Sequence, residues 1–86
     1  MNKPLVNQPM LASEWIQPGV QLRHYKGGLY TVEALCRIEA TLKTGVLYRS
    51  HQGDSQDVLW LRPLDEFSDR VMTQEGEVPR FSLVQR

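Results

Sequence analysis

The chain has 86 residues, of which 41% are hydrophobic and 23% are charged, and its ten basic side chains are balanced by ten acidic ones. A chain of this length builds one modest core, so we expect a single domain without a deep, walled active-site cavity. Cys36 is the only cysteine, which excludes an internal disulfide and a thiolate metal cluster. No apolar run reaches the length of a membrane span and no export signal precedes the domain, so we expect a cytoplasmic protein that does not bind membranes.

Residues 1–18 have the composition of a leader. Pro4, Pro9 and Pro18 remove backbone donors and restrict their neighbours, which disfavours strands in this stretch. Trp15 is too apolar to stay in water, and we expect it to pack on the body of the domain. The predicted organisation is therefore a partly ordered leader, residues 1–18, followed by one domain, residues 19–86.

The first predicted hairpin begins after Gly19. Apolar and polar residues alternate from Val20 to Tyr25, and Gly27 with Gly28 supplies the positive φ of a tight turn. The next strand runs from Leu29 to Ile38. Its alternation predicts one inward face along the whole strand, with Leu35 as the apolar exception on the outward face; the inward residues are Tyr30, Val32, Ala34, Cys36 and Ile38.

The remaining elements are short. We expect a loop over residues 39–45, a strand over 46–50, a polar loop over 51–57 and a strand over 58–62 that stops at Pro63. Residues 64–68 predict one helical turn. Residues 71–72 and 81–84 flank a turn at 74–76 and predict a last hairpin. The fold class that follows is a mostly-β, small SH3-like barrel of about five antiparallel strands with one short helical turn.

Several segments resemble a known family. They are His24-Tyr25-Lys26-Gly27-Gly28-Leu29-Tyr30, Tyr48-Arg49, Trp60-Leu61-Arg62-Pro63-Leu64-Asp65-Glu66-Phe67 and Val78-Pro79-Arg80-Phe81. The chain resembles the bacterial domain-of-unknown-function family numbered sixteen fifty-three from about Gly19 to Phe81. The resemblance implies an SH3-type β-barrel and no established activity. Members commonly have a His-Ser-Glu-Thr run where this chain has Ile38-Glu39-Ala40-Thr41, so any chemistry of that His and Glu is lost here.

The first candidate site is a set of aromatic and basic residues on neighbouring strands, which could bind by stacking, cation–π contacts and charge-assisted hydrogen bonds. Its members are Arg23, Tyr25, Lys26, Tyr48, Trp60 and Arg62. The alternative is that the rings fill the small core, and we favour that alternative for Tyr30 and Trp60 because both lie in strand centres. Tyr25, beside the turn, is the ring that we expect to be exposed.

The sequence supports a catalytic or metal-binding site less well than it supports the aromatic and basic set. His24 and Cys36 lie on strands that the hairpin pairs, but we expect Cys36 to be a buried thiol with a raised pKa. Ser50 and His51, with Asp54, Ser55 and Asp57, are triad residue types on a flexible loop that cannot hold the geometry of catalysis. His51, Asp54 and Asp57 could form a loose metal site, but their spacing matches no metal-binding motif. We therefore predict no catalytic residues, no metal and no cofactor.

Three functions stay open, as do the ligand and the oligomeric state. The leading hypothesis is a non-catalytic module that binds a protein or peptide partner on the aromatic and basic set. The second is single-stranded nucleic-acid binding by the same set, because residues 1–52 carry six basic and three acidic side chains. The third is a small hydrolase, or an accessory to an enzyme, that uses His24 or His51.

Overall fold

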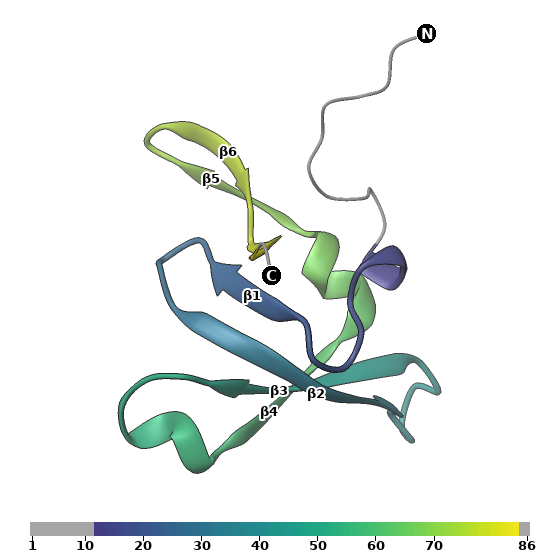
Figure 1. Ribbon diagram of the computed structural model, residues 1–86. Helices are drawn as coiled ribbons and strands as arrows, with labels where there is room; N and C mark the ends of the chain where they lie inside the picture. Colours follow the sequence, from purple (N-terminus) through teal and green to yellow (C-terminus); the bar gives the residue numbers. More distant parts are fainter. Residues whose placement is uncertain (1–11, 85–86) are drawn as a thin grey trace, which may run out of the picture.

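The computed structural model describes residues 12–84 of the chain, which form two antiparallel sheets and short 3₁₀ turns, one of which, η3, leads from the first sheet to the second (Figure 1). The larger sheet has the strand order β4-β3-β2-β1-β7, and β5 pairs with β6 in a separate hairpin. The elements in chain order are η1 (Ala12–Glu14), β1 (Gln21–His24), β2 (Leu29–Arg37), β3 (Thr44–Ser50), η2 (Gly53–Asp57), β4 (Leu59–Pro63), η3 (Leu64–Ser68), β5 (Arg70–Thr73), β6 (Gly76–Pro79) and β7 (Phe81–Leu83). The predictions of a mostly-β chain and of a helical turn at residues 64–68 are confirmed.

The β1–β2 hairpin closes as its glycines predict. Gly27 has a φ of +107°, a conformation that side chains other than glycine rarely adopt. The backbone amide of Gly27 donates to the carbonyl of His24, and the amide of His24 donates to the carbonyl of Gly28. These two bonds hold His24 at the tip of β1, beside the turn.

A β-bulge in β2 reverses the face that its side chains present. Val32 lies opposite Tyr48 and Ala34 opposite Leu47, so Glu33 is the extra residue. Val32 therefore points to the core, whereas Ala34 and Cys36 point to the outer face of the sheet. The predicted single inward face along β2 was wrong beyond Val32, because an extra residue shifts a period-two pattern by one position.

Leu35 changes sides for the same reason. It lies opposite Val46, a buried residue, and so shares the inner side of the sheet, yet it is 42% exposed. The thiol of Cys36 is half-buried on the outer face. The expectation of a fully buried Cys36 was therefore wrong.

The residues of the last predicted hairpin have other partners than the sequence indicated. Val71 lies opposite Val78 in the β5–β6 hairpin, and Phe81 lies opposite His24 on β1. The tight turn before Gly76, which has a φ of +111°, gives β5 a partner before the chain reaches residues 81–84. Phe81 is apolar and 1% exposed, and it crosses to the larger sheet. The predicted pairing of 71–72 with 81–84 was therefore wrong.

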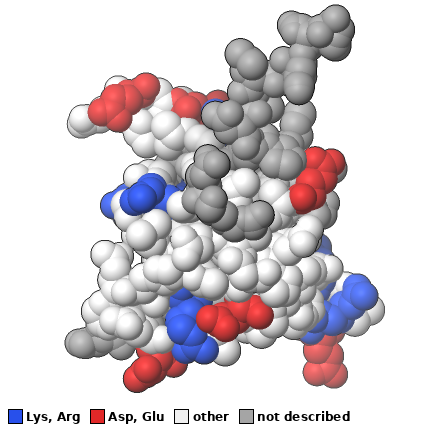
Figure 2. Space-filling view, in the orientation of Figure 1, with Lys and Arg blue, Asp and Glu red and all other residues white. Residues whose placement is uncertain are grey.

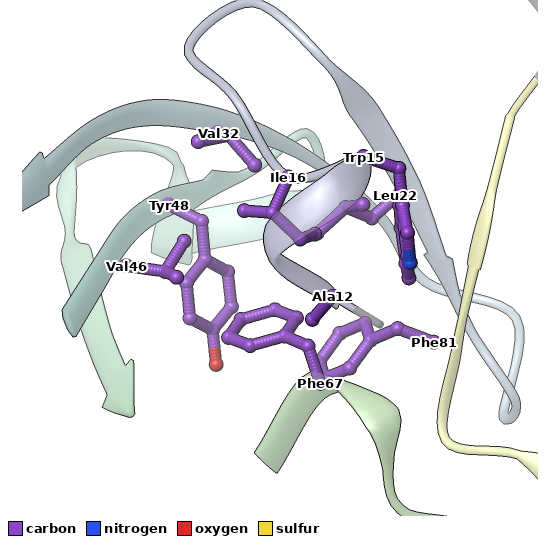
Figure 3. Close-up of a cluster of buried hydrophobic side chains, with 9 residues drawn as sticks. All are labelled: Ala12, Trp15, Ile16, Leu22, Val32, Val46, Tyr48, Phe67 and Phe81. Carbon is purple, nitrogen blue, oxygen red and sulfur yellow. The ribbon is translucent and has the colours of Figure 1, made fainter. Parts of the chain in front are cut away.

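The core lies on the inner side of the larger sheet and is closed by the two turns η1 and η3 (Figure 3). The buried hydrophobic residues of the described part are Ala12, Trp15, Ile16, Leu22, Val32, Val46, Tyr48, Phe67 and Phe81. The rings of Phe67 and Phe81 stack with centroids 4.7 Å apart. The prediction that Trp15 packs on the domain is confirmed, while residues 1–11 of the predicted leader lie outside the described residues.

Within residues 12–84, no helix is long and apolar enough to cross a membrane.

Candidate binding site

Trp60 lies on β4, the strand at one edge of the larger sheet. It is directly opposite Tyr48 on β3, and Arg62 is opposite Val46, so Trp60 and Arg62 point to the inner side. Because none of the strands in residues 12–84 pairs with the other side of β4, the indole stays 45% exposed. The expectation that Trp60 fills the core was wrong. Trp60 does lie in the middle of its strand, but that strand is at the edge of the sheet.

Tyr48, in contrast to Trp60, is buried in the core. Its ring is 6% exposed and packs edge-on against Phe67 and Phe81, with centroids 5.5 and 5.9 Å away. Its hydroxyl points out of the cluster (Figure 3) and accepts a hydrogen bond from Nε of Arg62 at 3.4 Å. Tyr30 is half-buried beside Tyr48, with ring centroids 5.4 Å apart. Tyr48 therefore supports the site from the core through its hydroxyl.

Arg62 is held on three sides. Nε donates to the hydroxyl of Tyr48, Nη1 donates to Oε1 of Glu66 at 3.0 Å, and Cζ lies 5.7 Å from the ring centroid of Phe81. Burial alone would lower the pKa of this guanidinium, but the hydrogen bond to Tyr48 and the carboxylate of Glu66 raise it above the ordinary value. Arg62 is thus a fixed positive charge beside an aromatic ring.

The tip of the β1–β2 hairpin reaches the same ring. His24 contacts Phe81 with centroids 5.1 Å apart, and Tyr25 contacts His24 at 4.7 Å. Nζ of Lys26 lies 5.8 Å from the ring centroid of Tyr25. Tyr25 is 37% exposed, which confirms the expectation for this ring. An unbroken row of contacts therefore runs from Arg62 through Phe81 and His24 to Tyr25 and Lys26.

Arg80 joins this row through its backbone. Its amide donates to the carbonyl of Asp69 at 2.9 Å, and its carbonyl accepts from the amide of Tyr25 at 2.9 Å. Nε of Arg80 lies 3.8 Å from Oδ2 of Asp69. We refer to His24, Tyr25, Lys26, Arg62 and Arg80, together with Trp60, which lies two residues before Arg62 on the same side of β4, as the aromatic/basic face.

The environment of His24 favours the neutral form of its ring. Burial lowers the pKa of His24 below 6.5, and the positive charges of Arg80, Lys26 and Arg62 lower it further. The amide of Lys26 donates to Nδ1 of His24 at 3.1 Å. Nδ1 is therefore an acceptor, and the single proton of the neutral ring lies on Nε2.

Arg23 does not share this face. It alternates with Leu22 and His24, which point inward, and so it points to the outer side of the sheet. Its guanidinium donates to the carbonyl of Gly27 at 3.3 Å. Of the six residues in the predicted set, the row of contacts joins Tyr25, Lys26 and Arg62. Tyr48 contacts Arg62 from the core, and Trp60 lies on the same side of β4 as Arg62.

The two predicted histidine constellations are not assembled. His24 points inward near one end of β2, whereas Cys36 points outward opposite Gly45. Nε2 of His51 is hydrogen-bonded to the hydroxyl of Thr31, and the hydroxyl of Ser50 is bonded to the backbone of Gln52.

The predicted metal set is only partly described. The side chain of Asp54 lies outside the described residues, and Asp57 is exposed. Over the described part of the chain, no three His, Cys, Asp or Glu side chains are grouped to hold a metal ion.

The comparisons with known proteins agree with this architecture. A family model described as a protein of unknown function, DUF1653, matches residues 21–83. The chain belongs to the DUF1653 family. A crystal structure of a DUF1653 protein from Bordetella bronchiseptica is similar to it, with a TM-score of 0.70 and 32% sequence identity over 83% of this chain and 90% of that chain. None of the curated proteins matches the chain.

Two members of the face in this DUF1653 chain were missed from the sequence. His24 carried a usable signal, because period-two alternation places it on the same side as Leu22. Arg80 carried none, since its position depends on the crossing of Phe81 to β1. Both residues reach the face through contacts between strands that are far apart in the sequence.

Proposed function

We propose that this DUF1653 chain is a non-catalytic binding module that recognises an extended segment of a protein or peptide on its aromatic/basic face. The observation that carries the proposal is the pairing of a half-exposed indole with a fixed guanidinium. Trp60 and Arg62 lie two residues apart on the same side of an edge strand, and Arg62 is held by Tyr48 and Glu66. Indole and guanidinium groups are the side chains that contribute most to binding at protein interfaces.

The energetics favour a ligand that covers these groups. A half-exposed Trp60 and an exposed Tyr25 leave apolar area in water, and covering it stabilises a complex. The supporting side chains are already held in place, so binding orders few additional rotamers. An extended peptide that lies across the aromatic/basic face contacts both rings and the guanidinium of Arg62.

The charge pattern favours a peptide over a nucleic acid. Arg49, one of the six basic residues in the stretch 1–52, is paired with Glu33 at 3.3 Å, and Arg23 points to the other side of the sheet. Among the described residues in Figure 2, basic and acidic side chains are interspersed with uncharged surface between them. A nucleic-acid backbone requires a denser run of cations.

The test is a selection of random dodecapeptides on the wild-type domain, followed by binding measurements and amide chemical shifts. We expect the selected peptides to shift the signals of Tyr25, Trp60 and Arg62, and Trp60→Ala to weaken binding at least about tenfold. Leu59→Ala is the matched control, because Leu59 is exposed on the opposite side of the same strand. Binding that is lost in Leu59→Ala and kept in Trp60→Ala contradicts the proposal, as does tighter binding of a uridine decamer than of any peptide.

We propose further that the two sheets are parts of a small SH3-like barrel. The bulge at Glu33 bends β2, and the bond between the amide of Arg80 and the carbonyl of Asp69 ties the chain before β7 to the start of the β5–β6 hairpin. An experimental structure in which the strands do not close around the core contradicts this fold. A cytoplasmic location belongs to the same proposal and is tested by cell fractionation.

A further inference from the structure

We infer that the aromatic/basic face contains a site for one carboxylate, formed by Arg62, Arg80 and His24. The inference rests on the proposed function, because the carboxylate belongs to an acidic side chain of the bound peptide. The site is built around the ring of Phe81. Arg62 and His24 both contact this ring, and Arg80 precedes it in the chain.

Hydrogen-bond donors remain for a ligand on all three residues. Nδ1 of His24 is occupied by the amide of Lys26, which leaves Nε2–H as a donor. Nε and Nη1 of Arg62 are occupied by Tyr48 and Glu66, and within the described part of the chain Nη2 has no partner. The two Nη groups of Arg80 are likewise without a protein acceptor among residues 12–84.

Arg80 has a buried hydrogen-bond donor without an acceptor among the described residues. Its Nε is buried and makes no hydrogen bond within the described structure, and the 3.8 Å to Asp69 is longer than a hydrogen bond. A buried donor without an acceptor destabilises the folded state, because it has lost its hydrogen bonds to water without gaining others. An incoming carboxylate that draws the guanidinium toward His24 and Arg62 relieves part of this cost, because a carboxylate accepts bidentate hydrogen bonds from arginine.

The local charge selects a single negative charge. Lys26, Arg62 and Arg80 supply three positive charges, and the carboxylates of Glu66 and Asp69 lie within 4 Å of the two arginines. The excess is one positive charge, which one carboxylate neutralises. The neutral state of His24 adds a donor without adding charge. A phosphate dianion or a nucleic-acid backbone leaves negative charge uncompensated in such a site.

The experiment compares two blocked pentapeptides that each contain one tyrosine and differ only by aspartate or asparagine. Binding is measured by calorimetry and by chemical shifts of the full chain. We expect the aspartate peptide to bind at least tenfold more tightly and to shift the signals of His24, Arg62 and Arg80. Arg80→Met should remove the difference between the two peptides, because it keeps the side-chain stem and removes the donors. Arg70→Met is the matched control, since Arg70 is exposed on β5 and pairs with Glu77.

Each outcome decides one of the two proposals. If both peptides bind equally and Trp60→Ala weakens both, the proposed function holds and the carboxylate site is overturned. If neither peptide binds at millimolar concentration, or if Arg70→Met acts like Arg80→Met, the carboxylate site is also overturned. Should Arg80→Met fail to fold, Arg80→Lys replaces it, because it keeps the charge, loses the planar fork and is expected to lose most of the preference for aspartate.

Discussion

Trp60 and Tyr48 lie directly opposite each other on β4 and β3 and point to the same side of the sheet, yet Tyr48 is 6% exposed and Trp60 is 45% exposed. The difference arises from position in the sheet. Tyr48 has β2 on one side and β4 on the other, and Phe67 and Phe81 cover its ring. Trp60 has a neighbouring strand on one side. The same side of one sheet therefore supplies both the core and the candidate binding surface.

This difference predicts opposite roles in stability and binding. Phe67→Ala should lower the free energy of unfolding by about 3–5 kcal/mol, because it removes a ring that is 1% exposed. Trp60→Ala should lower it by only about 1–2 kcal/mol, since half of the indole is already in water. Urea unfolding followed by circular dichroism measures both. A larger loss for Trp60→Ala than for Phe67→Ala would show that the indole is a core residue.

The segment before β1 is part of the folding unit. Trp15 and Ile16 are buried with the sheet residues, although the family match begins at residue 21. Trp15→Ala should therefore lower the free energy of unfolding by about 3–5 kcal/mol. Glu14→Ala is the control, because Glu14 is exposed one residue earlier, and its effect should stay within about 0.5 kcal/mol. Equal effects of the two changes would contradict the observed packing.

Gly45 leaves room for three side chains on the outer face of the sheet. A Cβ at this position would lie 2.7 Å from Cδ1 of Leu61, 2.9 Å from Cγ1 of Ile38 and 3.0 Å from Sγ of Cys36. Gly45→Ala should destabilise the domain by about 1–3 kcal/mol through overpacking. The same change in a Leu61→Ala background should cost less, because the nearest atom is gone. Additive effects in a double-mutant cycle would contradict this arrangement.

Stability should depend on the protonation of His24. Its pKa in the folded state is below 6.5, so the unfolded chain binds the proton more readily. The free energy of unfolding should therefore fall as the pH is lowered from about 6.5 toward the folded-state pKa, and level off below it. Thermal unfolding between pH 7 and pH 5 measures the slope.

The matched comparison for this pH dependence is between the two histidines. His24→Gln should flatten the slope in this window, because it removes the group whose pKa is lowered in the folded state. His51→Gln, which changes a histidine outside the aromatic/basic face, is the control and should keep the slope. If the pH dependence of stability disappears in His51→Gln and persists in His24→Gln, it does not arise from His24, and the prediction is refuted.

Local patterns determined the elements of this protein. The pair Gly27 and Gly28 predicted the β1–β2 turn, because only a residue without Cβ readily adopts the φ of +107° at Gly27. Period-two alternation predicted β1 and β2 to within one residue, since it follows from the geometry of a strand alone. The loop residues on either side predicted β3 and β4 to within two residues. The helical turn at residues 64–68 follows from Pro63 and from the spacing of Leu64 and Phe67.

Only the tertiary structure decided which faces and edges these elements present. The bulge at Glu33 turned Cys36 outward, the crossing of Phe81 to β1 brought Arg80 beside Tyr25, and the edge position of β4 left Trp60 exposed. Strand order and register depend on contacts between residues far apart in the sequence, and a one-residue shift reverses a face without any change in local composition. The sequence therefore predicted Tyr25, Lys26, Trp60 and Arg62, and the packing of the strands added His24 and Arg80 and excluded Arg23.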